Sequence, residues 1–257
     1  MKIDKSKNIV SVIVPYYKNK KFIKKTINSI LNQSYQKFEI LLIYDDTSKD
    51  DLQYIKKNFT NKKIKLLINR ENLGVAKSRN IGIKKSQGKF IAFLDSDDFW
   101  KKDKLKKQIK FMNDYSLDFS YTAYNILNDK KIFKKEVPLK IEYKDLLKKC
   151  DIGLSTVIIR RNLLKFGYFP NLKTQEDFAL WLRYARNFVN LMGINEALTI
   201  WRNTSNSLSS KEYQKITDAF KVFLFFEKKN IIVSIISVII LSMNKIKKNL
   251  KFYKSLF

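Results

Sequence analysis

The first ninety residues alternate short apolar runs with segments of helical periodicity, and this alternation limits the possible folds most strongly. Between the runs, apolar side chains such as Phe22, Ile23 and Ile27 recur at helical spacing. The runs themselves are short and rich in β-branched residues, which predicts buried strands at 9–15, 38–44, 64–68 and 89–94. Strands that alternate with helices predict a parallel, doubly wound sheet. Such sheets bind ligands beyond the carboxyl ends of their strands.

Clustered carboxylates follow two of these strands. Asp45-Asp46 ends one, and Asp95-Ser96-Asp97-Asp98 ends another. Three carboxylates in four residues repel one another, and a hard cation such as Mg²⁺ or Mn²⁺ removes that repulsion because it prefers oxygen ligands. The alternative is a helix N-terminus, with Asp98 or Asp103 as the cap. The second acidic pair, at the same sheet edge, favours a binding site.

Composition excludes several kinds of chemistry. The 257 residues include 52 Lys+Arg against 24 Asp+Glu, a net charge of +28, with no histidine and the single cysteine Cys150. Zinc sites with imidazole ligands, Ser-His-Asp triads, Cys-His dyads and internal disulfides are therefore excluded from this sequence. Because lysine, isoleucine and asparagine are abundant together, most of the positive charge is interpreted as solvated surface, and no nucleic-acid partner is expected.

The second half is less regular. Gly88 is expected to end a helix over 74–86 as a glycine stop. Glu176-Asp177 opens an amphipathic helix. Further strands are predicted at 118–124, 154–160 and 197–201, and a helix around Leu105, Ile109 and Met112.

The segment after residue 211 has a different character. Residues 231–243 contain no charge and would form about 20 Å of helix, against a hydrocarbon core of about 30 Å, so they are too short to span a bilayer. After Glu227 there are seven lysines and no acid. This pattern favours a helix lying on an anionic membrane surface. The alternatives are docking on the domain's own core or on a second copy, as a homo-oligomer.

Several motifs resemble those of family-2 glycosyltransferases. They begin with the strand Val12-Ile13-Val14-Pro15-Tyr16-Tyr17 and include the acidic turn at residues 93–98. The others occur in the family's order and spacing at residues 27–35, 44–50, 72–80, 175–178 and 201–202. One such motif would be weak, whereas the ordered set is specific and covers residues 9 to about 210.

The resemblance implies a GT-A fold, a mostly parallel α/β sheet flanked by helices, here with a C-terminal helical extension. Residues 1–210 would form the catalytic domain, with a nucleotide-binding half at 9–100 and an acceptor-binding half at 101–210. Residues 211–257 would be a basic helical tail that associates with membrane or oligomerises. The implied enzyme is an inverting, metal-dependent hexosyltransferase-like transferase that uses a nucleotide-diphosphate sugar, expected to be UDP-linked. Its expected acceptor is a saccharide or lipid-linked sugar in surface-polysaccharide synthesis.

The resemblance also implies where the donor binds. Pro15 and Tyr17 would line the nucleoside pocket, and Asp46 would hydrogen-bond the base or ribose. Arg79 or Arg202 is suited to reach the diphosphate. Taken singly, Asp46 is equally suited to cap the helix after Ser48, and each arginine to form a surface ion pair.

The remaining assignments concern metal and base. Asp97, or Asp98 beside it, would hold Mn²⁺ or Mg²⁺ on the diphosphate, with Asp95 near the ribose or metal. Asp177 would take the proton from the acceptor hydroxyl, flanked by Glu176. With no histidine, a carboxylate is the natural base, and a bound metal would neutralise the departing diphosphate. Asp177 is also suited to the first turn of a helix, where it favours the dipole.

The sequence departs from the family at some positions, and other functions compete. Asn203 and Thr204 stand where some relatives have a histidine, Trp201 stands where tyrosine is common, and residues 124–151 match nothing firmly.

A sugar nucleotidyltransferase would need a glycine-rich loop after the first strand, which the sequence lacks. A non-catalytic basic protein that binds nucleic acid or membrane would bind phosphate without needing a metal. The expected location is cytoplasmic, peripheral at the inner face of the cell membrane.

Overall fold

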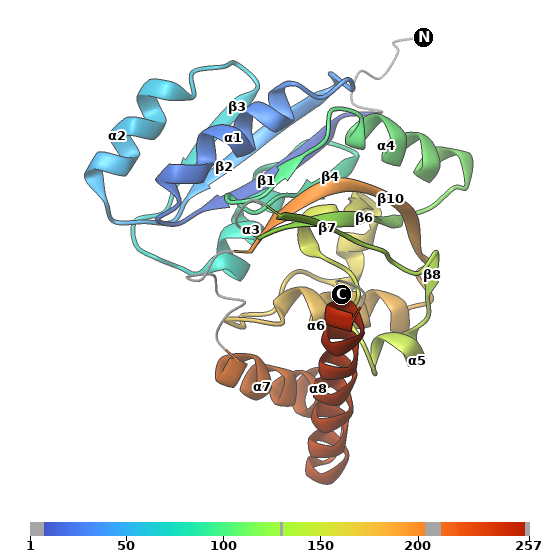
Figure 1. Cartoon of the computed structure of the whole chain (residues 1–257). Helices are drawn as coiled ribbons and strands as arrows, with labels where there is room; N and C mark the ends of the chain where they lie inside the picture. Colours follow the sequence, from blue (N-terminus) through green and yellow to red (C-terminus); the bar gives the residue numbers. More distant parts are fainter. Residues whose placement is uncertain (1–7, 129–130, 204–211, 255–257) are drawn as a thin grey trace.

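The computed structural model describes residues 8–128, 131–203 and 212–254, and Figure 1 shows a twisted central sheet with helices on both faces. Within these residues one ten-stranded sheet has the order β3-β2-β1-β4-β9-β6-β10-β5, with β7 paired to β6 and β8 to β10. The C-terminal helices lie beyond α6, on the side away from β1–β3 (Figure 1).

The first half of the sheet is parallel, as the alternating pattern predicts. β1 (Val10–Tyr16) pairs parallel with β2 (Phe38–Tyr44) and with β4 (Phe90–Phe93), and β2 pairs parallel with β3 (Ile64–Ile68). The connecting helices are α1 (Lys20–Leu31), α2 (Lys49–Asn58) and α3 (Val75–Lys85). Every residue of β1, β2 and β4 is buried, which explains their continuous apolar character.

The second half is mixed. The antiparallel β9 (Ile158–Arg160) lies between β4 and β6 (Phe119–Asn128), and β6 pairs parallel with β10 (Leu191–Arg202). β5 (Phe99–Trp100) and β8 (Lys140–Ile141) pair antiparallel with β10. The other elements here are β7 (Lys131–Lys135), α4 (Lys104–Asp114), α5 (Tyr143–Leu146), α6 (Glu176–Arg186) and two 3-10 helices, Leu154–Thr156 and Arg161–Phe166.

Two local predictions are wrong, and one alternative is met only in part. A single strand over 154–160 is replaced by a 3-10 turn and the short β9. Gly88 does not end α3, because the chain is already extended at Ser86 (φ −80°, ψ 151°). A Cβ at Gly88 would lie 2.5 Å from the carbonyl oxygen of Ile9, so glycine is needed there for close approach to the first strand. Asp103 precedes α4 but makes no capping hydrogen bond from its side chain.

The core lies on both faces of the sheet. Alternate residues of β1 and β2 belong to two separate apolar clusters, one beneath α1, α2 and α4 and the other beneath α3 and α6. Trp181 of α6 is fully buried in the second cluster, with its ring centroid 4.9 Å from that of Phe119. These contacts fix α6 against the sheet.

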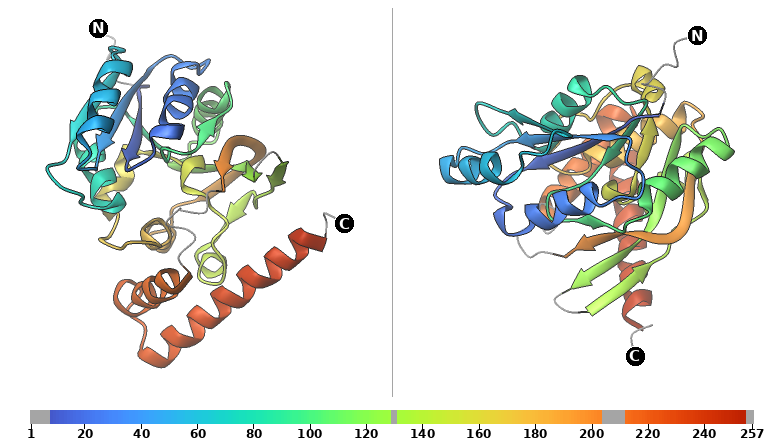
Figure 2. Two further views of the ribbon diagram at one scale, coloured as in Figure 1. Left: turned by 60° about the vertical axis from the view of Figure 1, so that its left-hand side comes forward. Right: turned by 90° about the horizontal axis from the view of Figure 1, so that it is seen from above.

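The C-terminal segment packs onto this second cluster. It comprises α7 (Glu212–Lys221), a π-helical turn (Val222–Phe226) and α8 (Ile231–Lys254). Ala219, Val222 and Phe223 are buried in the same cluster as Trp181. Figure 2 shows α8 as one long helix with a flank turned away from the rest of the molecule. No helix in the described ranges has the length and apolarity needed to cross a membrane.

Candidate active site

The acidic pair after β2 organises the carboxyl edge of the sheet. Asp45 accepts hydrogen bonds from the backbone N–H groups of Leu73 (2.8 Å) and Gly74 (2.9 Å), which fixes the turn into α3. Asp46 is 5% exposed and accepts from the N–H groups of Lys18 (3.2 Å) and Thr47 (2.7 Å). It therefore ties the end of β2 to the chain after β1. The N-cap of α2 is Ser48, whose hydroxyl accepts from Asp51 N–H.

The two residues expected at the nucleoside lie very differently. Pro15 is buried within β1, in register with Ile43. Tyr17, the first residue beyond the strand, is 47% exposed. The aromatic ring available to a ligand at this edge is therefore that of Tyr17, because Tyr16 is buried in a stack on Tyr44.

The acidic turn after β4 divides its carboxylates between interior and surface. Asp98 is 1% exposed, and its oxygens accept from the Ser155 hydroxyl (2.6 Å) and from the Arg202 N–H (2.9 Å). Burial and the neighbouring charges of Asp97 and Asp95 raise the pKa of Asp98. Asp97 is half-buried beside it. Asp98, assigned with Asp97 to the metal, thus has both oxygens engaged inside the protein.

Arg202 comes to this turn from the end of β10. Its Nε donates to the backbone oxygen of Asp97 at 3.0 Å, and its guanidinium lies 4.4 Å from the ring centroid of Phe22. The side chain is half-buried, so its position beside the acidic turn is fixed while part of it faces solvent. This placement agrees with a role near a bound anion.

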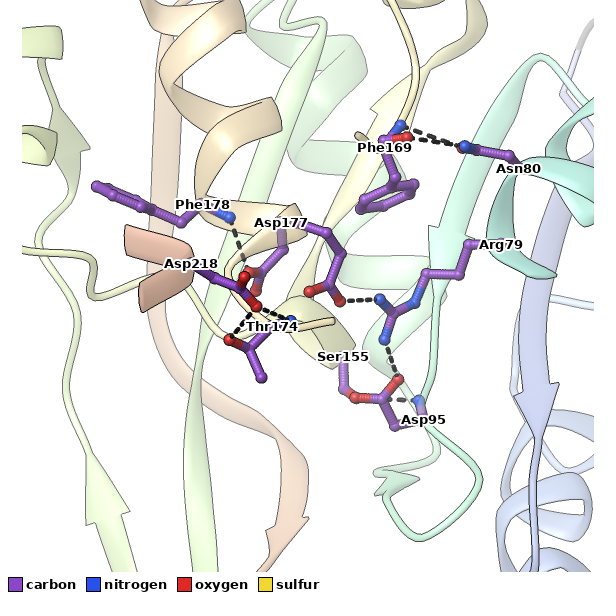
Figure 3. A network of polar contacts seen from close by, with 10 residues as sticks. Arg79, Asn80, Asp95, Ser155, Phe169, Thr174, Asp177, Phe178 and Asp218 are labelled. Atoms are coloured by element: carbon purple, nitrogen blue, oxygen red, sulfur yellow. Dashed lines mark hydrogen bonds and ion pairs between the residues drawn. The ribbon is translucent and has the colours of Figure 1, made fainter. Parts of the chain in front are cut away.

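Arg79, one of the two arginines suited to the diphosphate, is buried in a network of ion pairs. It is 3% exposed and forms ion pairs through Nη2 with Asp95 (2.6 Å) and through Nη1 with Glu176 (2.5 Å). Figure 3 shows its contact with Asp95. Both terminal nitrogens are engaged, because α3 places the guanidinium between the β4 turn and α6. The pKa of Arg79 is raised because the charges of Asp95 and Glu176 outweigh its burial. Arg79 therefore joins the two halves of the site.

Glu176 and Asp177 stand in the first turn of α6, where the helix dipole favours negative charge. Burial raises the pKa of both carboxyls, and the guanidinium of Arg79 opposes the rise. Asp177 accepts a hydrogen bond from the N–H of Phe178 at 2.7 Å. The raised pKa suits a carboxylate that must accept a proton near neutral pH.

Some site residues carry no signal in the sequence. Ser155 accepts from the Asp95 N–H (3.1 Å) and donates to Asp98, so it fixes the acidic turn from sixty residues away. Asp218 of α7 binds Thr174, three residues before Asp177. Both pairings are long-range, and neither residue lies in a recognisable motif.

The donor set fits a hard cation only in part. Within the described residues, no three or more His, Cys, Asp or Glu side chains converge as a metal cage. Asp95 is bound to Arg79 and Asp98 to Ser155, and Asp97 lies half-buried between them in the same turn. A Mg²⁺ or Mn²⁺ site with one or two carboxylates, completed by phosphate oxygens, is compatible with this arrangement.

Comparison with known proteins decides the family. The family model described as "Glycosyl transferase family 2" matches residues 11–170. The chain belongs to that family. It is therefore a glycosyltransferase, as the motifs predict. The chain is 34% identical over 250 residues to the putative teichuronic acid biosynthesis glycosyltransferase TuaG of Bacillus subtilis, covering 95% of this chain and 98% of TuaG.

A second relative has a more specific name. The Escherichia coli protein WfgD, named UDP-Glc:alpha-D-GlcNAc-diphosphoundecaprenol beta-1,3-glucosyltransferase, is 38% identical over 210 residues. That match covers 81% of this chain and 82% of WfgD.

Solved structures confirm the fold. The crystal structure of Staphylococcus aureus TarS 1-349 in complex with UDP-GlcNAc aligns with a TM-score of 0.70 at 23% identity, over 85% of this chain and 65% of that one. The mannosyltransferase PcManGT from Pyrobaculum calidifontis, in complex with GDP-Man and Mn2+, aligns with a TM-score of 0.66 at 15% identity, covering 86% and 64%. This glycosyltransferase has the GT-A fold, and its chain spans about two thirds of these solved chains.

Proposed function

We propose that the enzyme transfers a sugar from a UDP-sugar to a lipid-diphosphate-linked saccharide, with inversion at the anomeric carbon, in surface-polysaccharide synthesis. The observation that carries this proposal is the pair of ion pairs that Arg79 makes with Asp95 and Glu176. They hold the first turn of α6, which contains Asp177, against the acidic turn after β4. The names of two relatives support the substrate class, since TuaG is named for teichuronic acid biosynthesis and WfgD for a UDP-Glc donor and a diphosphoundecaprenol-linked acceptor.

The donor site is assigned to the carboxyl edge of β1, β2 and β4. Tyr17 offers an exposed ring on which the base can stack, and Asp46 lies beside it, held by the N–H of Lys18. Pro15 supports this edge from within β1, as the last but one residue of the strand. Arg202 adds a positive charge for the diphosphate beside Asp97.

Asp97 is the proposed ligand of a divalent cation, and Asp98 supports the turn from behind. A cation held there would supply Lewis-acid stabilisation of the departing diphosphate. Asp98 keeps the turn closed through Ser155 and the N–H of Arg202, so its contribution is to orient the backbone that carries Asp97.

Asp177 is the proposed general base. Inversion by single displacement requires the base on the ring face opposite the leaving group. Asp177 and Asp97 come from separate chain segments, α6 and the turn after β4, which permits this arrangement. Glu176, held by Arg79, keeps the first turn of α6 against the donor half.

The test is release of nucleoside diphosphate from a panel of nucleotide sugars, with and without a polyprenyl-diphosphate saccharide. Asp177→Asn should lower acceptor-dependent release by roughly 10²–10⁴-fold, because a general base contributes about that factor. The exposed Asp114→Asn is the matched control and should behave as wild type. Undiminished transfer by Asp177→Asn would remove Asp177 from the mechanism.

The same proposal places the enzyme at an anionic membrane surface, through α8. The polar and apolar sides of this helix are the reverse of those in an ordinary surface helix. Ser234 and Ser237 face the protein, at 0% and 9% exposure. The outward stripe is apolar and 48% to 70% exposed, and consists of Ile232, Ile235, Ile236, Ile239, Met243 and Ile246. Lysines flank the stripe with no acid after Glu227, so an anionic bilayer suits it, whereas two copies with this charge would repel.

Vesicle flotation tests this placement. The enzyme should float with vesicles containing phosphatidylglycerol and remain behind with pure phosphatidylcholine. The double variant Ile236→Ser/Ile239→Ser should lose most of this binding, and Ile132→Ser, an equally exposed isoleucine on β7, should not. If the double variant instead dissociates a dimer and binds vesicles normally, α8 is a subunit interface.

A further inference from the structure

The turn that enters α6 is held in an uncommon backbone conformation. Gln175, its N-cap residue, has φ 62° and ψ 12°, in the left-handed region. The side chain of Gln175 makes no capping hydrogen bond to the first turn of α6. A non-glycine residue in this region is strained and persists only where the surroundings hold it. The next two residues are Glu176 and Asp177, so whatever holds this turn also places the base.

Asp218 of α7 is what holds it. This residue is 1% exposed, and its Oδ2 accepts from both the N–H and the hydroxyl of Thr174, each at 3.0 Å. Gln214 donates to the same oxygen (2.9 Å), and Lys221 pairs with Oδ1 (3.0 Å). These donors lower the pKa of Asp218 against the effect of burial, so the carboxylate is ionised when it binds Thr174. Figure 3 shows Asp218 reaching Thr174 alongside Asp177.

Apolar packing supports the same junction. The ring of Phe178, the residue after Asp177, lies 6.0 Å from that of Phe223 at 74°. At the other end of α6, Arg186 pairs with Glu227, which also accepts from the Tyr143 hydroxyl. The C-terminal segment therefore contacts both ends of the helix that carries the base.

We infer that Asp218 is a positioning residue for sugar transfer: it fixes Thr174 and the left-handed Gln175, and thereby the direction of Asp177. This inference rests on the proposed role of Asp177 as the base. Asp218 touches neither donor nor acceptor in this scheme. Its loss should therefore lower kcat while leaving the affinity for UDP unchanged, because a small misplacement of a catalytic group can cost roughly 100-fold.

The test compares Asp218→Ala with Asp218→Asn in the full chain, measuring kcat, the donor KM and the dissociation constant for UDP. The alanine variant should lose between about ten- and 100-fold in kcat with donor KM and UDP affinity within about twofold of wild type. The asparagine variant keeps an oxygen for the Thr174 N–H and should recover most of the rate. Asp114→Ala, which removes an exposed carboxylate from an i,i+4 pair, is the matched control.

Two outcomes would overturn the inference. One is wild-type kcat in folded Asp218→Ala; the other is an equal loss of kcat and UDP affinity, which would indicate a general structural role. If the alanine variant fails to fold, Thr174→Val is tested instead, because it removes the hydroxyl contact and keeps the backbone N–H contact with Asp218. This variant should lower kcat without changing UDP affinity. An unchanged kcat would count against the inference. Failure of the proposed function is distinguishable, because Asp177→Asn would then remain active whatever Asp218 does.

Discussion

Carboxylates that are neighbours in the sequence of this enzyme have different hydrogen-bond partners, and these partners determine which carboxylates are engaged inside the protein. Asp45 and Asp98 are engaged by donors from remote segments, the first by the turn at Leu73 and the second by Ser155 and Arg202. The sequence shows that acids gather at the strand ends and why a cation would suit them. It does not show which acid faces inward, because that depends on donors from distant residues such as Ser155.

Arg79 should be the most stability-sensitive of the predicted site residues. It is buried between two carboxylates, so Arg79→Met leaves Asp95 and Glu176 without their cation. Breaking a buried pair from one side costs about 3–5 kcal/mol, and we expect urea unfolding to show a loss of that order. The double variant Arg79→Met/Glu176→Gln also removes the unpaired charge of Glu176 and should recover part of the free energy of unfolding. A loss below about 1 kcal/mol for the single variant would mean that the bridge contributes little.

The pH dependence of transfer reports on Asp177. As the proposed base, it must be unprotonated, and burial raises its pKa above the ordinary 3.8. The rate should therefore fall as the pH is lowered through that raised pKa, so that kcat/KM begins to decline at a higher pH than it would with an ordinary aspartate as the base. Because Glu176 lies beside it, the apparent pKa belongs to the pair. A profile of kcat/KM that stays flat down to pH 4, with the enzyme still folded, would contradict this.

At the scale of elements, the first half could be predicted closely and the second only in part. The apolar run of β2 is buried along its whole length and that of β3 is partly exposed, and both strands have the predicted bounds. β10 begins six residues before the predicted start at Ala197, because its polar residues and register shifts interrupt the apolar pattern. The 3-10 turn at residues 154–156 is set by long-range bonds, including Trp100 Nε1 to the Ser155 oxygen (2.8 Å), which no local pattern encodes.

Gly88 provides a test at this scale. A Cβ there would lie 2.5 Å from the Ile9 oxygen and 2.8 Å from the Ser11 nitrogen, both backbone atoms that cannot easily move. Gly88→Ala should therefore lower the free energy of unfolding by about 1–3 kcal/mol, the usual cost of overpacking. Gly153→Ala is the control, since its nearest neighbour would be at an ordinary 3.5 Å. Equal stabilities for the two variants would show that β1 can shift to accept the methyl group.

At the scale of the whole molecule, the C-terminal segment shares an apolar core with the part of the chain before residue 210. Ala219, Val222 and Phe223 share the core of α6, while the outward flank of α8 carries exposed isoleucines. The lysine-flanked apolar run indicates a surface helix from sequence alone. Its inner contacts could not be predicted, because Asp218–Thr174 and Phe178–Phe223 join residues more than forty positions apart.

We propose that this glycosyltransferase binds its nucleotide through a cation held at Asp97. Calorimetric titration of UDP in Mn²⁺ and in EDTA, for the wild type and Asp97→Asn, tests it most directly. The wild type should bind UDP at least about tenfold more tightly with Mn²⁺, a difference of about 1.4 kcal/mol. Asp97→Asn should bind equally weakly in both conditions and unfold at the wild-type temperature. Equal UDP affinity of the wild type with and without Mn²⁺ would show that nucleotide binding needs no cation at Asp97.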